Sequence, residues 1–133
     1  MRAEEPNAAR PRVLVIDDEP LIGRAIKRSL PGYEVIYEER ASRAIERVGE
    51  GEMFDIVLCD LTMPSTDGLS VLQAIVKLAP ELDGRIALMT GGASDAAWEE
   101  ITSRKVTVIN KPFAPDALIS MLGELLQSSR KKS

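Results

Sequence analysis

The stretch that decides the fold covers residues 12 to 19 and reads Arg12-Val13-Leu14-Val15-Ile16-Asp17-Asp18-Glu19. Its first five residues form a short, largely β-branched apolar run, which predicts a buried strand, and three acids follow where that strand ends. Apolar residues at helical spacing come next, between Pro20 and Leu30, and Pro31-Gly32 ends that pattern. A buried strand that leads directly into a helix favours an α/β fold.

The same alternation of strand and helix continues along the chain. Further strands are predicted at Tyr33–Tyr37, Phe54–Cys59, Arg85–Met89 and Val106–Ile109. Further helices are predicted at Ala41–Val48, Gly68–Leu78, Ser94–Ile101 (with Ser94 as its N-cap) and Pro115–Leu126. Five strands alternating with five helices predict a doubly wound parallel sheet of the flavodoxin-like kind, with strand order 2-1-3-4-5. The second strand is the most polar, which suits a sheet edge.

Residues that can carry chemistry follow four of these strands. The first strand leads into Asp17 and Asp18, the third into Asp60, the fourth into Thr90 and the fifth into Lys111. Because the carboxyl ends of parallel strands meet at one sheet edge, we expect these side chains to share one crevice. Neighbouring carboxylates repel one another unless a proton or a cation intervenes. With oxygen ligands and no histidine in the sequence, Mg²⁺ is favoured, and Mn²⁺ is the alternative.

A carboxylate, a divalent cation, a lysine and a hydroxyl together suit the transfer of a phosphoryl group. Aspartate is a known nucleophile for this reaction, which depends mainly on positioning and on charge stabilisation. Taken singly, each residue has a plain structural explanation, such as an acid near a helix start or a polar residue in a turn. Their expected meeting at one edge favours the functional explanation.

At these residues the sequence resembles the response-regulator receiver family, over about residues 12 to 127. The matching motifs are Val13-Leu14-Val15-Ile16-Asp17-Asp18-Glu19, Asp60-Leu61-Thr62-Met63-Pro64 with Asp67-Gly68, Met89-Thr90-Gly91, and Lys111-Pro112-Phe113. Each motif alone is weak, but all four in this order, at the ends of the right strands, are highly specific.

The resemblance implies a role for each acid. Asp60 is similar to the phosphoacceptor of the family, and Asp18 is similar to a direct Mg²⁺ ligand. Asp17 would contact the metal partly through water, and Thr62 would offer its backbone carbonyl. The implied donor is a phosphohistidine on a sensor histidine kinase or a histidine phosphotransfer domain.

The resemblance also implies roles for the residues that follow the fourth and fifth predicted strands. Thr90 is similar to the hydroxyl that turns toward the phosphate, and Lys111 to the lysine that pairs with a phosphate oxygen, with a cis Lys111–Pro112 bond. Many receivers carry an aromatic residue three positions before that lysine, where this chain has Val108, which favours a phosphorelay or hybrid-kinase setting. Gly91 and Gly92 are expected to leave the crevice open to donor and water.

Length and composition limit the domain organisation, the partners and the cellular setting of the protein. The 133 residues, 44% hydrophobic and 29% charged, fit one globular domain at 12–127, with a disordered lead or linker at 1–11 and a flexible tail at 128–133. A net charge of −4 argues against nucleic-acid binding, and no apolar run is long enough to insert in a membrane. The single cysteine, Cys59, excludes an internal disulfide and fits a buried residue of a cytoplasmic protein. A homodimer is left open.

Three classes of function remain. The first is a signalling receiver, not a turnover enzyme, that passes on its phosphoryl group or switches a protein–protein surface. The second is a small Mg²⁺-dependent phosphohydrolase, which usually needs a carboxylate two residues after the nucleophile, where this chain has Thr62, and a cap domain. The third is a receiver used only for docking, and the complete set of acids, Thr90 and Lys111 argues against it. Many turnovers of a phosphate ester would favour the hydrolase, and one slowly decaying phosphorylation the receiver.

Overall fold

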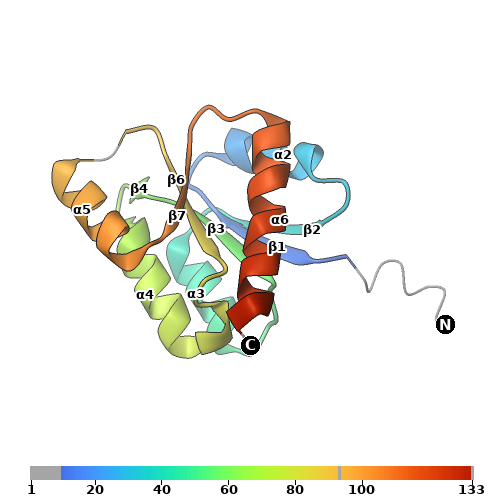
Figure 1. Ribbon diagram of the computed structural model, residues 1–133, viewed down its shortest axis with the longest axis horizontal. Helices are drawn as coiled ribbons and strands as arrows, with labels where there is room; N and C mark the ends of the chain where they lie inside the picture. The colour runs from blue at the N-terminus through green and yellow to red at the C-terminus, as the bar shows by residue number, and fades with distance from the viewer. Residues whose placement is uncertain (1–9, 93, 133) are drawn as a thin grey trace.

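The computed structural model describes residues 10–92 and 94–132, so that most of the predicted lead, Ala93 and Ser133 lie outside the described residues. One parallel sheet crosses the molecule in the order β2-β1-β3-β6-β7 (Figure 1). Its strands are β1 (Arg12–Ile16), β2 (Glu34–Glu38), β3 (Ile56–Asp60), β6 (Ile86–Thr90) and β7 (Thr107–Asn110). The predicted strand order is therefore confirmed, with the second strand at an edge.

Helices cover both faces of this sheet. They are α2 (Pro20–Ser29), α3 (Ala41–Gly49), α4 (Gly68–Leu78), α5 (Asp95–Arg104) and α6 (Pro115–Lys132), and a short 3₁₀ turn, η1 (Pro80–Leu82), follows α4. Apolar residues of α2 and α6 pack on one face of the sheet, and those of α3, α4 and α5 pack on the other (Figure 1). The doubly wound, flavodoxin-like architecture predicted from the alternating pattern is therefore confirmed.

Two apolar cores result from the pleat of the strands. Successive side chains of a strand point to opposite faces, and in β1 Val13 and Val15 enter the core under α2 and α6. Leu14 and Ile16 enter the core under α3 and α4. All five residues of β3 are buried, including Cys59, as expected for a central strand covered on both sides.

Some boundaries differ from those predicted. Residues Thr62–Met63 (β4) and Thr66–Asp67 (β5) form a two-stranded antiparallel hairpin, in a segment where the sequence analysis predicted no strand. Ser94 caps α5 as predicted, accepting a hydrogen bond from the N–H of Ala97, but that helix ends three residues later than expected. The backbone of α6 continues from the predicted end at Leu126 to Lys132, because no proline or glycine interrupts it.

In the described part of the chain, no helix combines the length and apolar character that crossing a membrane requires.

Candidate functional site

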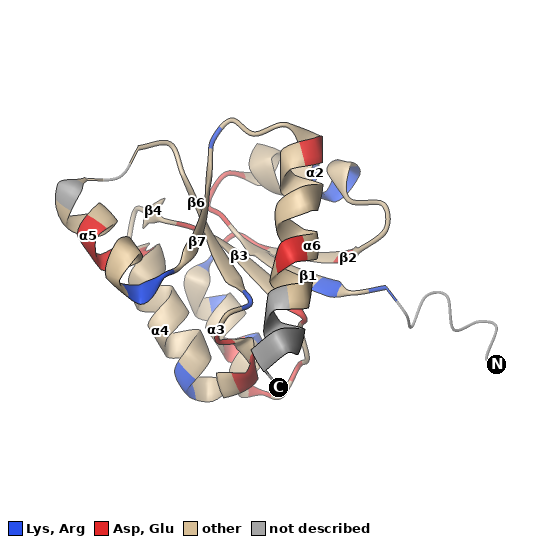
Figure 2. Cartoon of the chain, viewed as in Figure 1, with Lys and Arg blue, Asp and Glu red and all other residues tan. Residues whose placement is uncertain are grey.

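Three carboxyl groups meet where β1 and β3 end. These strands are neighbours, with Ile16 paired to Cys59, so the residues that follow them lie side by side. One carboxylate oxygen each of Asp17, Asp18 and Asp60 lie within 4.8 Å of one another. Asp17 is completely buried and Asp60 is 6% exposed. Figure 2 shows the acidic segment between β1 and α2 in red. The sheet edge thus collects the three acids that the sequence predicted to converge.

Lys111 supplies the positive charge of this cluster. Its Nζ donates a hydrogen bond to Oδ2 of Asp17 at 2.9 Å and lies 3.4 Å from Oδ1 of Asp60. The carboxylate of Glu19 is also near, at 3.9 Å from the same Nζ. The Lys111–Pro112 peptide bond is cis, as the resemblance implied, and the N–H of Lys111 donates to the carbonyl of Thr90. The loop after β7 therefore directs the ammonium group toward the acids.

The electrostatics of the site favour a further cation. Burial, followed by the charge of Asp17, raises the pKa of Asp60, although Lys111 and the N–H of Thr62 oppose the shift. Burial alone would lower the pKa of Lys111, but its hydrogen bond and charge interaction with Asp17, together with Asp60, outweigh burial and raise it. One ammonium therefore faces three carboxyl groups, which leaves the cluster negative and suited to a metal ion.

Every polar group of Asp17, in the backbone and in the side chain, makes a hydrogen bond. Its N–H donates to the carbonyl of Glu38, and its own carbonyl accepts a hydrogen bond from the hydroxyl of Tyr37 at 2.6 Å. Its Oδ1 accepts from the N–H of Glu19 at 2.9 Å, and its Oδ2 accepts from Lys111. Tyr37 was not among the predicted site residues. Burial, followed by the charges of Glu39, Asp17 and other nearby acids, raises the pKa of Tyr37 to about 12, so this hydroxyl acts as a donor.

The loop after Asp60 folds closely against that residue. The N–H of Thr62 lies 3.4 Å from Oδ1 of Asp60, and the N–H of Gly68 donates to the carbonyl of Leu61 at 2.7 Å. A Cβ atom at Gly68 would lie 2.6 Å from the backbone oxygen of Asp60, so only glycine fits there. The β4–β5 hairpin thus folds tightly back beside Asp60.

Thr90 lies at the same sheet edge, on the other side of Asp60. Strands β3 and β6 are paired with Asp60 opposite Met89, and Thr90 is the residue after Met89. Its side chain is buried, and its Oγ1 accepts a hydrogen bond from the N–H of Gly92 at 2.9 Å. A Cβ atom at Gly91 or Gly92 would meet no atom within 4 Å, which agrees with the expected open crevice. Val108 is half-buried against the core.

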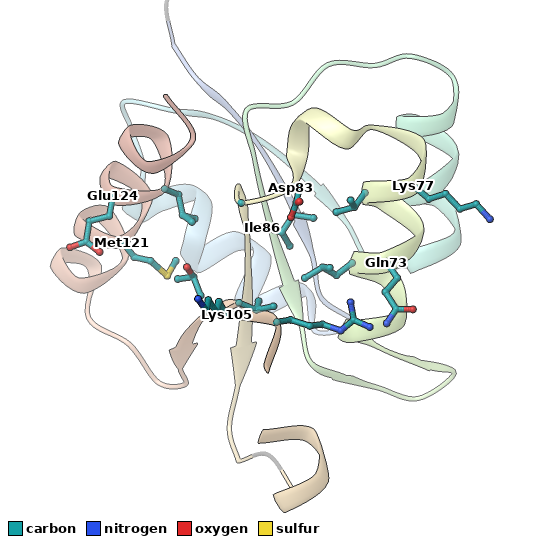
Figure 3. Close-up of a pocket in the computed structure, with 14 residues that line it drawn as sticks. Gln73, Lys77, Asp83, Ile86, Lys105, Met121 and Glu124 are labelled. Carbon is teal, nitrogen blue, oxygen red and sulfur yellow. The ribbon is translucent and has the colours of Figure 1, made fainter. Parts of the chain in front are cut away.

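Of two hollows in the described part of the chain, one borders the cluster and the other does not. One of about 540 Å³ opens beside Asp18, between the start of α3 and the β4–β5 hairpin, and leaves room next to the acids. The other, of about 850 Å³, lies between α4 and α6 at the amino ends of β6 and β7. Figure 3 shows Met121 and Glu124 on one side of it, Gln73 on the other, and Ile86 and Lys105 between them. None of the acids, Thr90 or Lys111 lines this second groove.

The family assignment rests on a comparison with known protein families. The model of the response regulator receiver domain matches residues 13–123, which include every predicted site residue. The chain belongs to this family. The receiver is 34% identical over 122 residues to the transcriptional regulatory protein ZraR of Klebsiella oxytoca, a match that covers 89% of this chain and 27% of that protein. It is 29% identical over 119 residues to the chemotaxis protein CheY of Bacillus subtilis, covering 86% and 97% of the two chains.

Solved structures agree with this assignment. The CheY-like receiver domain protein of Methanospirillum hungatei superposes with a TM-score of 0.84 at 27% identity, covering 94% of this chain and all of that one. Some relatives are much longer, and this chain spans 36% of a protein-glutamate methylesterase of Myxococcus xanthus. The chain is thus a receiver of two-component signal transduction, and its acidic site is of the type that accepts phosphoryl groups in this family.

Proposed function

We propose that Asp60 accepts a phosphoryl group from a phosphohistidine, in a reaction that depends on Mg²⁺. The observation that carries this proposal is the meeting of Asp60 with two further carboxyl groups, within 4.8 Å, while Lys111 lies 3.4 Å from it. The donor would be a sensor histidine kinase or a histidine phosphotransfer domain, since the family works with such partners. The receiver proper would comprise residues 12–127 and, with its unpaired Cys59, would work in the cytoplasm.

The donor set fits magnesium. All candidate ligands are hard oxygens: the carboxylates of Asp18 and Asp60 and the backbone carbonyl of Thr62. Both oxygens of Asp17 already accept hydrogen bonds, which supports a contact through water rather than a direct one. Bound there, Mg²⁺ would neutralise charge on the phosphoryl oxygens and on the acids.

The chain's own residues would perform the transfer. A carboxylate oxygen of Asp60 attacks phosphorus and forms the new P–O bond, while the P–N bond to the histidine breaks. The electron pair of that bond returns to the imidazole nitrogen of the donor. Lys111 would pair with one phosphoryl oxygen. The hydroxyl of Thr90, which now accepts a hydrogen bond from the N–H of Gly92, would instead donate one to a second phosphoryl oxygen.

The product would act as a signal. Phosphorylation adds roughly −1.5 to −2 charge, and Lys111 and Thr90 must reorganise to meet it. The segment from Thr90 through α5 to β7 is the candidate switch, because α5 buries few residues, with Ile101 the main one. With Val108 in place of the usual aromatic residue, we propose a phosphorelay or hybrid-kinase setting. The output would be a protein surface, which includes the option of a homodimer.

A labelling experiment tests this proposal. The chain is incubated with Mg²⁺ and acetyl phosphate, and its intact mass is recorded over time. We expect one phosphoryl group on the wild type and on the control Asp83→Asn, an exposed acid at the opposite sheet edge, and none on Asp60→Asn. Labelling that persists in Asp60→Asn would refute the proposed acceptor. Repeated turnover of a small phosphate ester would favour the hydrolase instead.

A further inference from the structure

A tyrosine outside the predicted site contacts the peptide bond that joins two of the acids. Tyr37 lies on β2, opposite Val15 of β1, and its ring packs in the core under α2. Its hydroxyl reaches past the end of β1 and donates to the carbonyl of Asp17 at 2.6 Å. That carbonyl belongs to the peptide unit between Asp17 and Asp18, so the hydrogen bond fixes the plane of this unit.

A glycine on the neighbouring helix makes room for the ring. A Cβ atom at Gly23 would lie 2.6 to 2.8 Å from three ring atoms of Tyr37, closer than any ordinary contact. Because Gly23 lies in the interior of α2, where glycine lowers helix stability by roughly 1 kcal/mol relative to alanine, its presence needs a packing reason. The ring of Tyr37 provides that reason.

The geometry points to Tyr37 as a positioning residue: we propose that its hydroxyl, admitted by Gly23, orients the Asp17–Asp18 peptide so that Asp18 faces the metal. The other contacts of Asp17 hold its side chain and its N–H, and only Tyr37 among the described residues holds its carbonyl. Without this bond, the peptide unit can rotate and carry the carboxylate of Asp18 away from Asp60. This inference rests on the proposed Mg²⁺ site.

The substitution Tyr37→Phe removes the hydroxyl and keeps the ring. We expect the Mg²⁺ dissociation constant, measured by isothermal titration calorimetry well below the melting temperature, to rise about tenfold, the lower end of the range for lost partners of metal ligands. Tyr33→Phe is the matched control, because Tyr33 also packs in this core and its hydroxyl makes no hydrogen bond with the described residues. Its affinity should equal that of the wild type.

A second variant, on helix α2, should disturb the same hydrogen bond between Tyr37 and Asp17. Gly23→Ala should displace the ring and weaken Mg²⁺ binding in the same way, and adding Gly23→Ala to Tyr37→Phe should weaken it little further, since the hydroxyl is already absent. A role in packing alone would lower the melting temperature and leave the dissociation constant unchanged. That result for Tyr37→Phe would overturn the inference. Failure of the wild type itself to bind Mg²⁺ would instead refute the proposed metal site.

Discussion

Replacing Lys111 by methionine should have opposite effects on stability and on metal affinity. The ammonium contacts Asp17, which is fully buried, and only 17% of the lysine side chain is exposed. Breaking a buried ion pair destabilises by about 3–5 kcal/mol. Because Asp17 keeps its hydrogen bond from the N–H of Glu19, we expect a smaller loss for the metal-free protein, about 2–3 kcal/mol. For a chain of this size that lowers the melting temperature by about 10 °C.

The same substitution should strengthen the binding of Mg²⁺. Lys111 occupies oxygens of Asp17 and Asp60 and places a positive charge beside the site, so removing it lowers the repulsion of a divalent cation. We expect affinity to rise about tenfold, or about 1.4 kcal/mol, well below the unscreened Coulomb value. Thermal unfolding with and without chelator, together with calorimetric Mg²⁺ titration, measures both effects. Lys77→Met, on the exposed side of α4, is the control. Unchanged metal-free stability, or weaker Mg²⁺ binding, would refute the reasoning.

Three further substitutions, two of them with a matched control, test backbone crowding, charge burial and core packing. Gly68→Ala places a Cβ atom 2.6 Å from the backbone oxygen of Asp60 and should cost about 1–3 kcal/mol in urea unfolding, whereas Gly123→Ala, which meets nothing within 4 Å, should stabilise by up to about 1 kcal/mol. Burial raises the pKa of Asp60, so this carboxyl group stabilises the fold below its unfolded pKa, and that stability is lost as the pH rises through its folded pKa. Asp60→Asn should therefore be more stable than the wild type at neutral pH in chelator, and a lower unfolding midpoint there would contradict this. Ile75→Ala empties a fully buried position and should cost about 2–5 kcal/mol by the same assay, against less than about 0.5 kcal/mol for Leu78→Ala, which is 51% exposed.

The candidate site could be predicted because topology alone brings its residues together. A parallel sheet places every strand's carboxyl end at one edge, so Asp17, Asp60, Thr90 and Lys111 had to be neighbours once the strand order was correct. The strand order followed from the polar second strand and the apolar runs of the others. No distance was needed for this step, only the position of each residue relative to its strand.

Other features depend on geometry that the pattern does not contain. The bond from Tyr37 to Asp17 requires the register of β1 against β2 and the path of α2 over Gly23, and none of these follows from periodicity. The hairpin of Thr62–Met63 with Thr66–Asp67 consists of two-residue strands, too short for an alternating pattern to appear. A glycine in the middle of an amphipathic helix was the one available signal, and by itself it names no partner.

Cys59 can serve as a chemical probe of local opening around the central strand β3. Its thiol is fully buried one residue before Asp60, and burial raises its pKa far above the ordinary value, so almost no thiolate is present in the folded protein. Cys59 lies in the core under α3 and α4, and the sequence contains no other cysteine, so a thiol-specific alkylating reagent can react only when this side of the sheet is uncovered. The rate of that modification therefore measures how often the core beside Asp60 opens, and a metal or phosphoryl group bound at the proposed site should slow it by stabilising the fold.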